Sequence, residues 1–206
     1  MSTLAFALAA TIKHNGHGGV ADLLSTPEQT AAWLAAHEQL VAQVLGPTSD
    51  LGRFMRPNRA EILPESGVRD ELVQVRGAVR ALFARAVAPG APSKADADRL
   101  IDVDAALRMV NRAADRLGAT HLDWPEGGAP VTRWVGRTDD PIALLVGAVG
   151  RSAIDFLASS DRERLRACPA ARCVKYFLQD DPRQTWCSPS CGNRERVNRH
   201  YRKRHG

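Results

Sequence analysis

Four cysteines within one short segment constrain this 206-residue chain more than any other feature. They form two close pairs, Cys168-x4-Cys173 and Cys187-x3-Cys191, with thirteen residues between the pairs. Tetrahedral Zn²⁺ prefers four soft ligands at about 2.3 Å, and each close pair can present two thiolates from one tight turn of backbone. Two disulfides would require an oxidising compartment, and an iron–sulfur cluster could use the same four ligands. The spacing favours a Zn²⁺ site formed by all four cysteines over these two alternatives.

The sequence around the cysteines is typical of a small zinc module. Residues 174–178 are predicted to form a short strand, 180–183 a turn, and 185–186 the start of a return strand. Ser188 and Pro189 then suit the cap and the first position of a helix. The last two cysteines would lie at the start of that helix, where the helix dipole favours thiolates. This order predicts a treble-clef-like module that depends on zinc for much of its folding free energy.

A strongly basic helix is predicted to follow the last cysteine. Residues 192–204 would span about 20 Å as a helix, and the major groove of B-DNA, about 12 Å wide, admits one. We expect the stripe of Arg194, Val197 and Tyr201 to face inward, against the metal lobe or the body. Asn193 and Arg194 lie so near the metal that we expect them to hydrogen-bond around the thiolates. The candidate contacts to phosphates or base edges are Arg196, Arg199, Arg202, Lys203 and Arg204.

The charge of the chain is unevenly distributed. Residues 161–206 contain 12 Lys and Arg against 5 Asp and Glu, whereas residues 1–160 contain 16 against 18. A neutral-to-acidic body with a basic tail indicates a polyanionic partner, most often nucleic acid. A solvated C-terminal segment would have the same composition, so the cysteine pattern decides in favour of a partner.

Residues 1–160 have the periodicity of a mostly helical body. Thr26 is expected to cap the first long helix, with Pro27 at its first position and Gln29 completing a capping box. Apolar runs on either side of a Pro/Gly turn predict a hairpin, and the segment 46–64 is rich in loop residues. Predicted helices cover about 27–45, 65–88, a stretch from the capping signature Ser93–Asp96 to Gly118, and 141–158; the hairpin strands are 121–124 and 131–135.

The expected fold class is therefore mainly α (α+β). A helical N-terminal domain with a small β-hairpin, residues 1–160, precedes the zinc module of residues 161–206. The apolar stretch Leu4–Ile12 has no basic residue before it, so we interpret it as core rather than as a signal peptide. No run of 18 apolar residues occurs, so we expect no membrane span and a cytoplasmic protein.

The body contains no recognisable catalytic motif, such as a phosphate-binding glycine loop, HExxH or GxSxG. His14 and His17 lie in a Gly/Asn-rich segment that we interpret as a loop, and His37 as a surface or hydrogen-bonded histidine. The tryptophans of the body, Trp33, Trp124 and Trp134, are most simply core or edge-of-core residues that could also line a small-molecule pocket. We therefore do not expect an enzyme.

The string Trp186-Cys187-Ser188-x-x-Cys191-Gly192-Asn193-Arg194, preceded by Cys-x4-Cys, resembles the CGNR zinc finger. The segment Asp22–Pro27 leading into Trp33-Leu34 resembles the start of that family's usual N-terminal partner, the ABATE domain. The resemblance implies a mostly bacterial, stress-induced transcription regulator whose four cysteines bind zinc and whose finger binds DNA. One departure is Ala10-Thr11, where family members often carry Asn-Thr.

The leading expectation is a regulator whose finger docks the basic helix on double-stranded DNA, while the N-terminal domain either forms a homodimer or senses a signal such as a small-molecule effector. Two finger copies would supply the specificity that one finger lacks. The alternative is a zinc-stabilised protein-interaction module whose basic helix meets an acidic partner. RNA binding is a variant of it, although the module offers few aromatic side chains on which bases could stack. A site with four cysteines leaves zinc no open position for catalysis.

Overall fold

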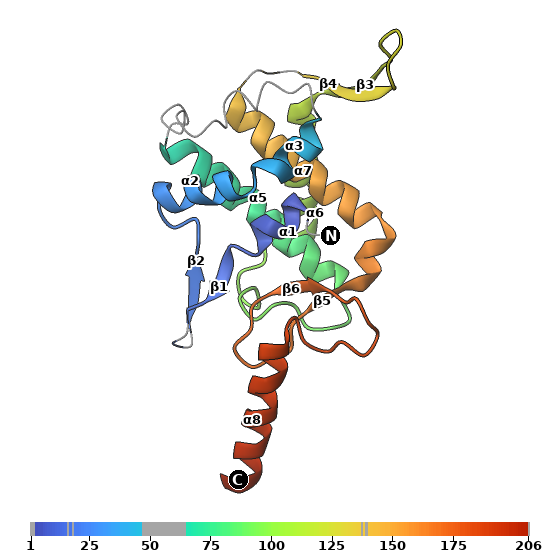
Figure 1. Ribbon diagram of the computed structural model, residues 1–206. Coiled ribbons are helices and arrows are strands. Elements are labelled where there is room, and N and C mark those ends of the chain that lie inside the picture. The colour runs from blue at the N-terminus through green and yellow to red at the C-terminus, as the bar shows by residue number, and fades with distance from the viewer. Residues whose placement is uncertain are drawn as a thin grey trace.

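A computed structural model describes residues 3–15, 17, 19–46, 65–136, 138 and 140–205. Figure 1 shows a helical body around two long helices, a β-hairpin projecting from one end, and a single helix leading away at the other end. The described residues contain seven α-helices and three two-stranded antiparallel sheets. The predicted class, mainly α with small hairpins and a C-terminal cysteine module, is confirmed.

The N-terminal apolar stretch forms part of the core, as predicted. Helix α1, Leu4–Ala9, begins after Thr3, whose hydroxyl caps it, and nearly all of it is buried. A hairpin of strands β1, Ile12–His14, and β2, Val20–Asp22, follows, with Ile12 paired to Asp22. Asn15 closes the connection, because its side-chain oxygen accepts hydrogen bonds from the backbone N–H groups of His17 and Gly19.

The first long helix begins as predicted but is divided in two. Helix α2, Pro27–Ala36, starts after Thr26, whose hydroxyl accepts from the Gln29 N–H. His37 interrupts the helix; its Nδ1 bonds to the Trp33 carbonyl at 2.7 Å and its ring stacks on the Trp33 indole. Helix α3, Glu38–Leu45, then ends at Gly46, and the loop-rich segment 47–64 lies outside the described residues.

Two long helices form the centre of the body. Helix α5, Glu65–Ala86, was predicted over about 65–88 and buries an apolar face that includes Leu72, Val79 and Phe83. Helix α7, Pro141–Ala158, is capped by Asp140 and packs against α1, α3 and α5. By length and composition α7 could cross a membrane, which for one such helix is weak evidence, and 50% of it is buried inside the fold.

Helix α6, Val103–Ala114, packs closely on α7 but begins later than predicted. Asp102 caps it, and the expected capping signature Ser93–Asp96 lies instead in a turn whose two polar ends are buried. Leu100 and Leu107 are exposed, and the buried face of α6 is formed by Ala106, Val110 and Ala113. Two glycines of α7, Gly147 and Gly150, allow α6 and the segment after it to approach closely.

The predicted hairpin is present and projects from the body. After the short 3-10 helix η2, Asp115–Leu117, strand β3, Ala119–Asp123, pairs with β4, Val131–Val135. Trp124, expected at the core or its edge, is 68% exposed at the hairpin, so that expectation is wrong for Trp124. Trp33 is buried as expected, and the Trp134 side chain lies outside the described part of the structure.

The cysteine module follows α7 through a 3-10 helix, η3, Ser160–Arg164. Strand β5, Leu165–Ala167, pairs with β6, Tyr176–Leu178, and helix α8, Pro189–His205, ends the described chain. The predicted return strand at 185–186 is wrong, because β6 pairs with the strand that precedes the first cysteine. Alternation along β6 turns Tyr176 into the core of the body and Phe177 toward the cysteines.

Candidate metal centre and basic helix

The structure brings the four cysteines together in one cluster. All four Sγ atoms lie within 4.8 Å of one another, and Cys187 Sγ is 3.6 Å from both Cys173 Sγ and Cys191 Sγ. Cys168, Cys173 and Cys191 are buried. Among the described residues, this is the one group of metal-ligating side chains close enough to hold an ion.

The donor set fits a tetrahedral dication. Four thiolates at about 2.3 Å from a central Zn²⁺ would stand about 3.8 Å apart, close to the sulfur spacing observed. The neighbouring thiols of Cys173 and Cys187 lower the pKa of Cys168, whereas Cys168 and Cys173 raise the pKa of Cys187. Four thiolates this close would repel one another, and a metal dication at their centre would stabilise all four.

Local backbone bonds place the two cysteine pairs. The Cys168 N–H donates to the Lys175 carbonyl at 2.9 Å, and the Cys173 N–H donates to the Ala170 carbonyl at 2.9 Å, so a tight turn closes between β5 and β6. The hydroxyl of Ser188 accepts from the Cys191 N–H at 3.3 Å and caps α8, as the sequence predicted. Cys187 lies just before the helix and Cys191 in its first turn.

Glu195 joins the two halves of the module. Its carboxylate accepts the Ala171 N–H at 2.8 Å, from the turn between the first two cysteines, and the Asn198 side-chain amide at 3.3 Å. The carboxylate thereby sets the direction of α8 relative to that turn. Sequence reasoning did not single out Glu195, because a lone acid in a basic helix carries no local signal for a contact 24 residues away.

Helix α8 carries six cations and one carboxylate over 17 residues. The predicted inward stripe is wrong: Val197 is 67% exposed, Tyr201 is 65% exposed and Arg194 is also exposed. Helix α8 leads away from the body, so the body does not cover these side chains (Figure 1).

The predicted nucleic-acid contacts lie on this projecting helix. Arg196, Arg199 and Arg204 are exposed, whereas the side chains of Arg202 and Lys203 lie outside the described part of the structure. Asn193 and Arg194, which we expected to bond around the thiolates, are both exposed, and Asn193 accepts a hydrogen bond from Arg196. Asn193 instead helps to position one of the candidate arginines.

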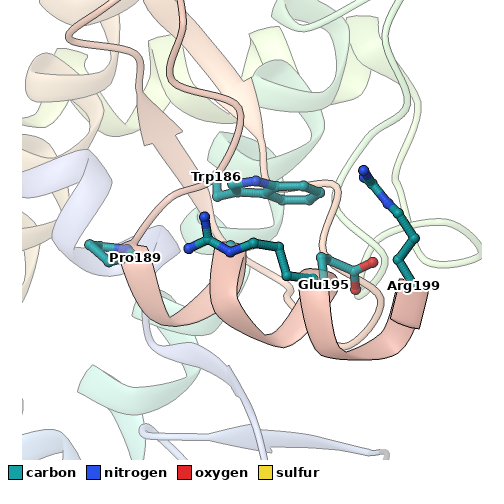
Figure 2. Close-up of a pocket in the computed structure, with 6 residues that line it drawn as sticks. Trp186, Pro189, Glu195 and Arg199 are labelled. Atoms are coloured by element: carbon teal, nitrogen blue, oxygen red, sulfur yellow. The ribbon is translucent and has the colours of Figure 1, made fainter. Parts of the chain in front are cut away.

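Trp186 lies across the start of α8 and forms a shallow pocket with it. Figure 2 shows the indole over the helix, between Pro189 and Arg199. A Cβ atom at Gly192 would come within 2.9 Å of the Trp186 ring, so a glycine is required for this close approach. The pocket of about 230 Å³ thus combines an aromatic face with the guanidinium groups of Arg196 and Arg199.

A buried polar network holds the module on the body. Arg80 of α5 forms a bidentate ion pair with Asp96, at 2.7 and 3.0 Å, and the Tyr176 hydroxyl donates to the same carboxylate at 2.7 Å. Ser93 completes the network by donating to the Val174 carbonyl at 2.8 Å. Burial and the Asp96 carboxylate raise the pKa of Tyr176 above its usual range, so the phenol stays protonated and donates.

Lys94 reaches from the same turn to the first cysteine pair. Its ammonium group donates to the carbonyls of Cys168, Pro169 and Ala170 at 3.3, 3.1 and 2.9 Å. The segment read from sequence as a helix cap therefore serves as the contact between the body and the metal centre. No sequence period could show this, because the partners are some 75 residues apart.

Two family models match the chain and define its class. Residues 2–160 match ABATE, described as "Putative stress-induced transcription regulator", and residues 164–204 match the CGNR zinc finger. Because the first match covers well over half of the chain, the chain belongs to the ABATE family, and it also carries a CGNR zinc finger. The resemblance inferred from the sequence motifs is confirmed. No curated protein matches the chain at a significant level.

Proposed function

We propose that this protein is a zinc-dependent transcription regulator whose finger binds double-stranded DNA through α8. The observation that carries this proposal is the placement of α8: a basic helix anchored at one end by the cysteine cluster and projecting freely at the other. Its 17 residues span about 25 Å, enough to lie along a major groove. Family membership as a regulator with a zinc finger supports the same reading.

Zn²⁺ is the proposed metal, held by Cys168, Cys173, Cys187 and Cys191. The all-sulfur donor set and the clustering of all four Sγ atoms around one point support a single Zn²⁺ over two separate disulfides. Native mass spectrometry of protein purified without added metal is expected to show one Zn²⁺ per chain, lost in Cys173→Ser. Bound iron with inorganic sulfide would contradict the assignment.

The proposed contacts to DNA are the cations of α8: Arg196, Arg199, Arg202, Lys203 and Arg204. Trp186 and Asn193 position Arg196. Arginine forks suit both phosphate oxygens and guanine edges. Since α8 carries a net charge of +5, several phosphates would be neutralised on docking. One helix of this size reads few base pairs, so we propose that two copies bind together as a homodimer.

Titration of labelled genomic duplex fragments with the zinc-loaded full chain tests the proposal. We expect preferred fragments, two chains per bound duplex in mass photometry, and an affinity that falls steeply between about 50 and 200 mM salt. Binding of every fragment alike would reduce α8 to a nonspecific electrostatic contact. Failure to bind any fragment at either salt concentration would refute DNA binding.

A protein-interaction module is the second candidate, favoured by one observation. Val197 and Tyr201 are exposed one helical turn apart on α8, and exposed apolar side chains at this spacing suit a partner protein. An acidic partner would then meet the basic face. Val197→Ser with Tyr201→Ser distinguishes the two: it would abolish partner capture, but it would leave the salt dependence of DNA binding unchanged.

A further inference from the structure

A second site is suggested by a cavity in the body, away from the metal centre. It has a volume of about 370 Å³ and lies between the β1–β2 hairpin, α5 and the segment 95–100. This volume is within the usual range for small-molecule sites. Neither the cysteine cluster nor the proposed DNA contacts include any of its lining residues.

The cavity has one positive charge in excess. Arg76 pairs with Asp22 through two bonds of 2.6 Å, and Arg80 pairs with Asp96 in the same bidentate manner. Arg99, at the rim, is exposed, and its guanidinium has no partner among the residues that the structure describes. The two buried arginines are thus neutralised, and Arg99 supplies a cation for a ligand.

Gly77 on α5 leaves the space open. A glycine in a helix interior costs about 1 kcal/mol relative to alanine, yet a Cβ here would meet nothing within 4 Å. Packing against a neighbouring element therefore does not explain this glycine. Its missing side chain keeps the wall of the cavity clear beside both buried arginines.

The remaining walls are apolar and face the opening. Val20 from β2 is 40% exposed and Leu100 from the facing segment is 39% exposed, and both line the cavity with Val73 of α5. A ligand with an apolar body would cover these side chains. A single excess cation matches a monoanion better than a dianionic phosphate, because a second negative charge would have no partner.

We propose that this cavity binds a small organic carboxylate, whose carboxylate pairs with Arg99 and whose apolar body lies along Gly77 between Val20 and Leu100. The bound carboxylate acts on the finger through Arg80 and Asp96, which line the cavity and also hold Tyr176 and the Val174 carbonyl. This second part rests on the proposed DNA-binding function, and the first part does not.

Benzoate is a suitable probe, with neutral benzamide as its match in shape. Titrated into the zinc-loaded full chain and followed by amide NMR shifts, benzoate is expected to move the Gly77 and Arg99 signals. Benzamide is expected to bind at least tenfold more weakly. Arg99→Gln removes the cation and Gly77→Leu fills the space, so each variant is expected to weaken benzoate binding at least tenfold. Arg108→Gln, an exposed arginine on α6, is the control and is expected to bind like the parent.

The result that overturns the site is benzoate binding no tighter than benzamide, or unaltered binding in Gly77→Leu once its amide spectrum shows a folded body. Preference for inorganic phosphate over benzoate would overturn the monoanion assignment.

The coupling between the cavity and the finger is tested by DNA binding. Saturating benzoate is expected to change the DNA affinity of the parent at least threefold and to leave the DNA affinity of Arg99→Gln unchanged. Equal DNA affinities of the parent with and without benzoate would refute the coupling. Because benzoate binding is measured without DNA, it stands even if the chain fails to bind DNA.

Discussion

Arg76 and Arg80 are two buried cations one turn apart on α5, and each is tied to a carboxylate from a different part of the chain. Arg76 reaches Asp22 of β2 and the buried Thr11 hydroxyl; Arg80 reaches Asp96. Removing one partner of a buried pair leaves an uncompensated charge, which costs far more than the pair itself contributes. These residues therefore fix the positions of the hairpin and of the 93–96 turn.

The Asp22 pair predicts a pH dependence of stability. Partial burial opposes ionisation of Asp22, but the Arg76 guanidinium and the Leu24 N–H outweigh it and lower the pKa of Asp22 below its usual value. Its contribution is therefore present above about pH 4 and is lost as pH falls through the lowered pKa. Urea unfolding of Asp22→Asn is expected to show a loss of about 2 kcal/mol at pH 7 that shrinks toward pH 3. A loss that does not change with pH would contradict the ion pair.

The Tyr176 hydroxyl predicts how strongly the finger is anchored. It donates to Asp96 and accepts the Ser93 N–H at 3.2 Å, so Tyr176→Phe leaves both buried groups short of a partner. We expect a loss of about 1–2 kcal/mol in the free energy of unfolding. Tyr201→Phe on the exposed part of α8 is the matched control and should change stability by less than about 0.5 kcal/mol. Equal effects of the two variants would show that the network does not anchor the finger.

At the scale of elements, the positions of the long helices were predictable from the sequence, and the pairing of the short strands in the finger was not. Caps such as Thr26 and Asp140 and a long apolar period locate α2, α5 and α7 within a few residues. At the break, the His37 ring bonds to the Trp33 carbonyl and stacks on the Trp33 indole, and no sequence period shows such contacts. Three-residue strands such as β1 carry too few residues for a period. Partner choice for β6 was missed because both neighbouring segments have strand composition, and only packing on the body selects β5.

Two helical glycines predict opposite effects of the same substitution. Gly77→Ala is expected to stabilise the protein by about 0.5–1 kcal/mol, because the added methyl group meets no atom and raises helix propensity. Gly150→Ala is expected to destabilise it by about 1–3 kcal/mol, since its Cβ would lie 2.7 Å from the Ala114 nitrogen. Thermal unfolding of the two variants beside the parent measures both, and a gain in Gly150→Ala would contradict the α6–α7 packing.

At the scale of the whole molecule, the finger shares its core with the body. Leu165 and Tyr176 belong to the main hydrophobic cluster, whereas the cysteines and Phe177 form a small second cluster. The sequence was sufficient to predict that the four cysteines form one cluster and that Ser188 caps α8, because those signals are local. The sequence could not predict that Trp186 packs against Gly192 or that Lys94 donates to the carbonyls around the first cysteine pair. Those contacts arise only when the folded chain brings the segments together.

This division predicts what metal removal does. The small cluster is too limited to fold alone, so chelation is expected to expose the first cysteine pair and the start of α8 to amide exchange. Helices α5 and α7 should stay protected, because their core includes no cysteine. Hydrogen exchange mass spectrometry before and after chelation measures this. Loss of protection throughout the chain would show one cooperative unit instead.

Salt dependence of DNA binding is the most direct test of the central claim that α8 is the DNA-binding element. Arg196→Gln with Arg199→Gln removes two proposed phosphate contacts, and Arg108→Gln with Arg112→Gln removes the same charge from the exposed face of α6. The slope of log K against log salt is expected to become less negative by about 2 in the α8 variant and to stay at the parent value in the α6 variant. Equal slopes in all three proteins would show that α8 does not contact the DNA backbone.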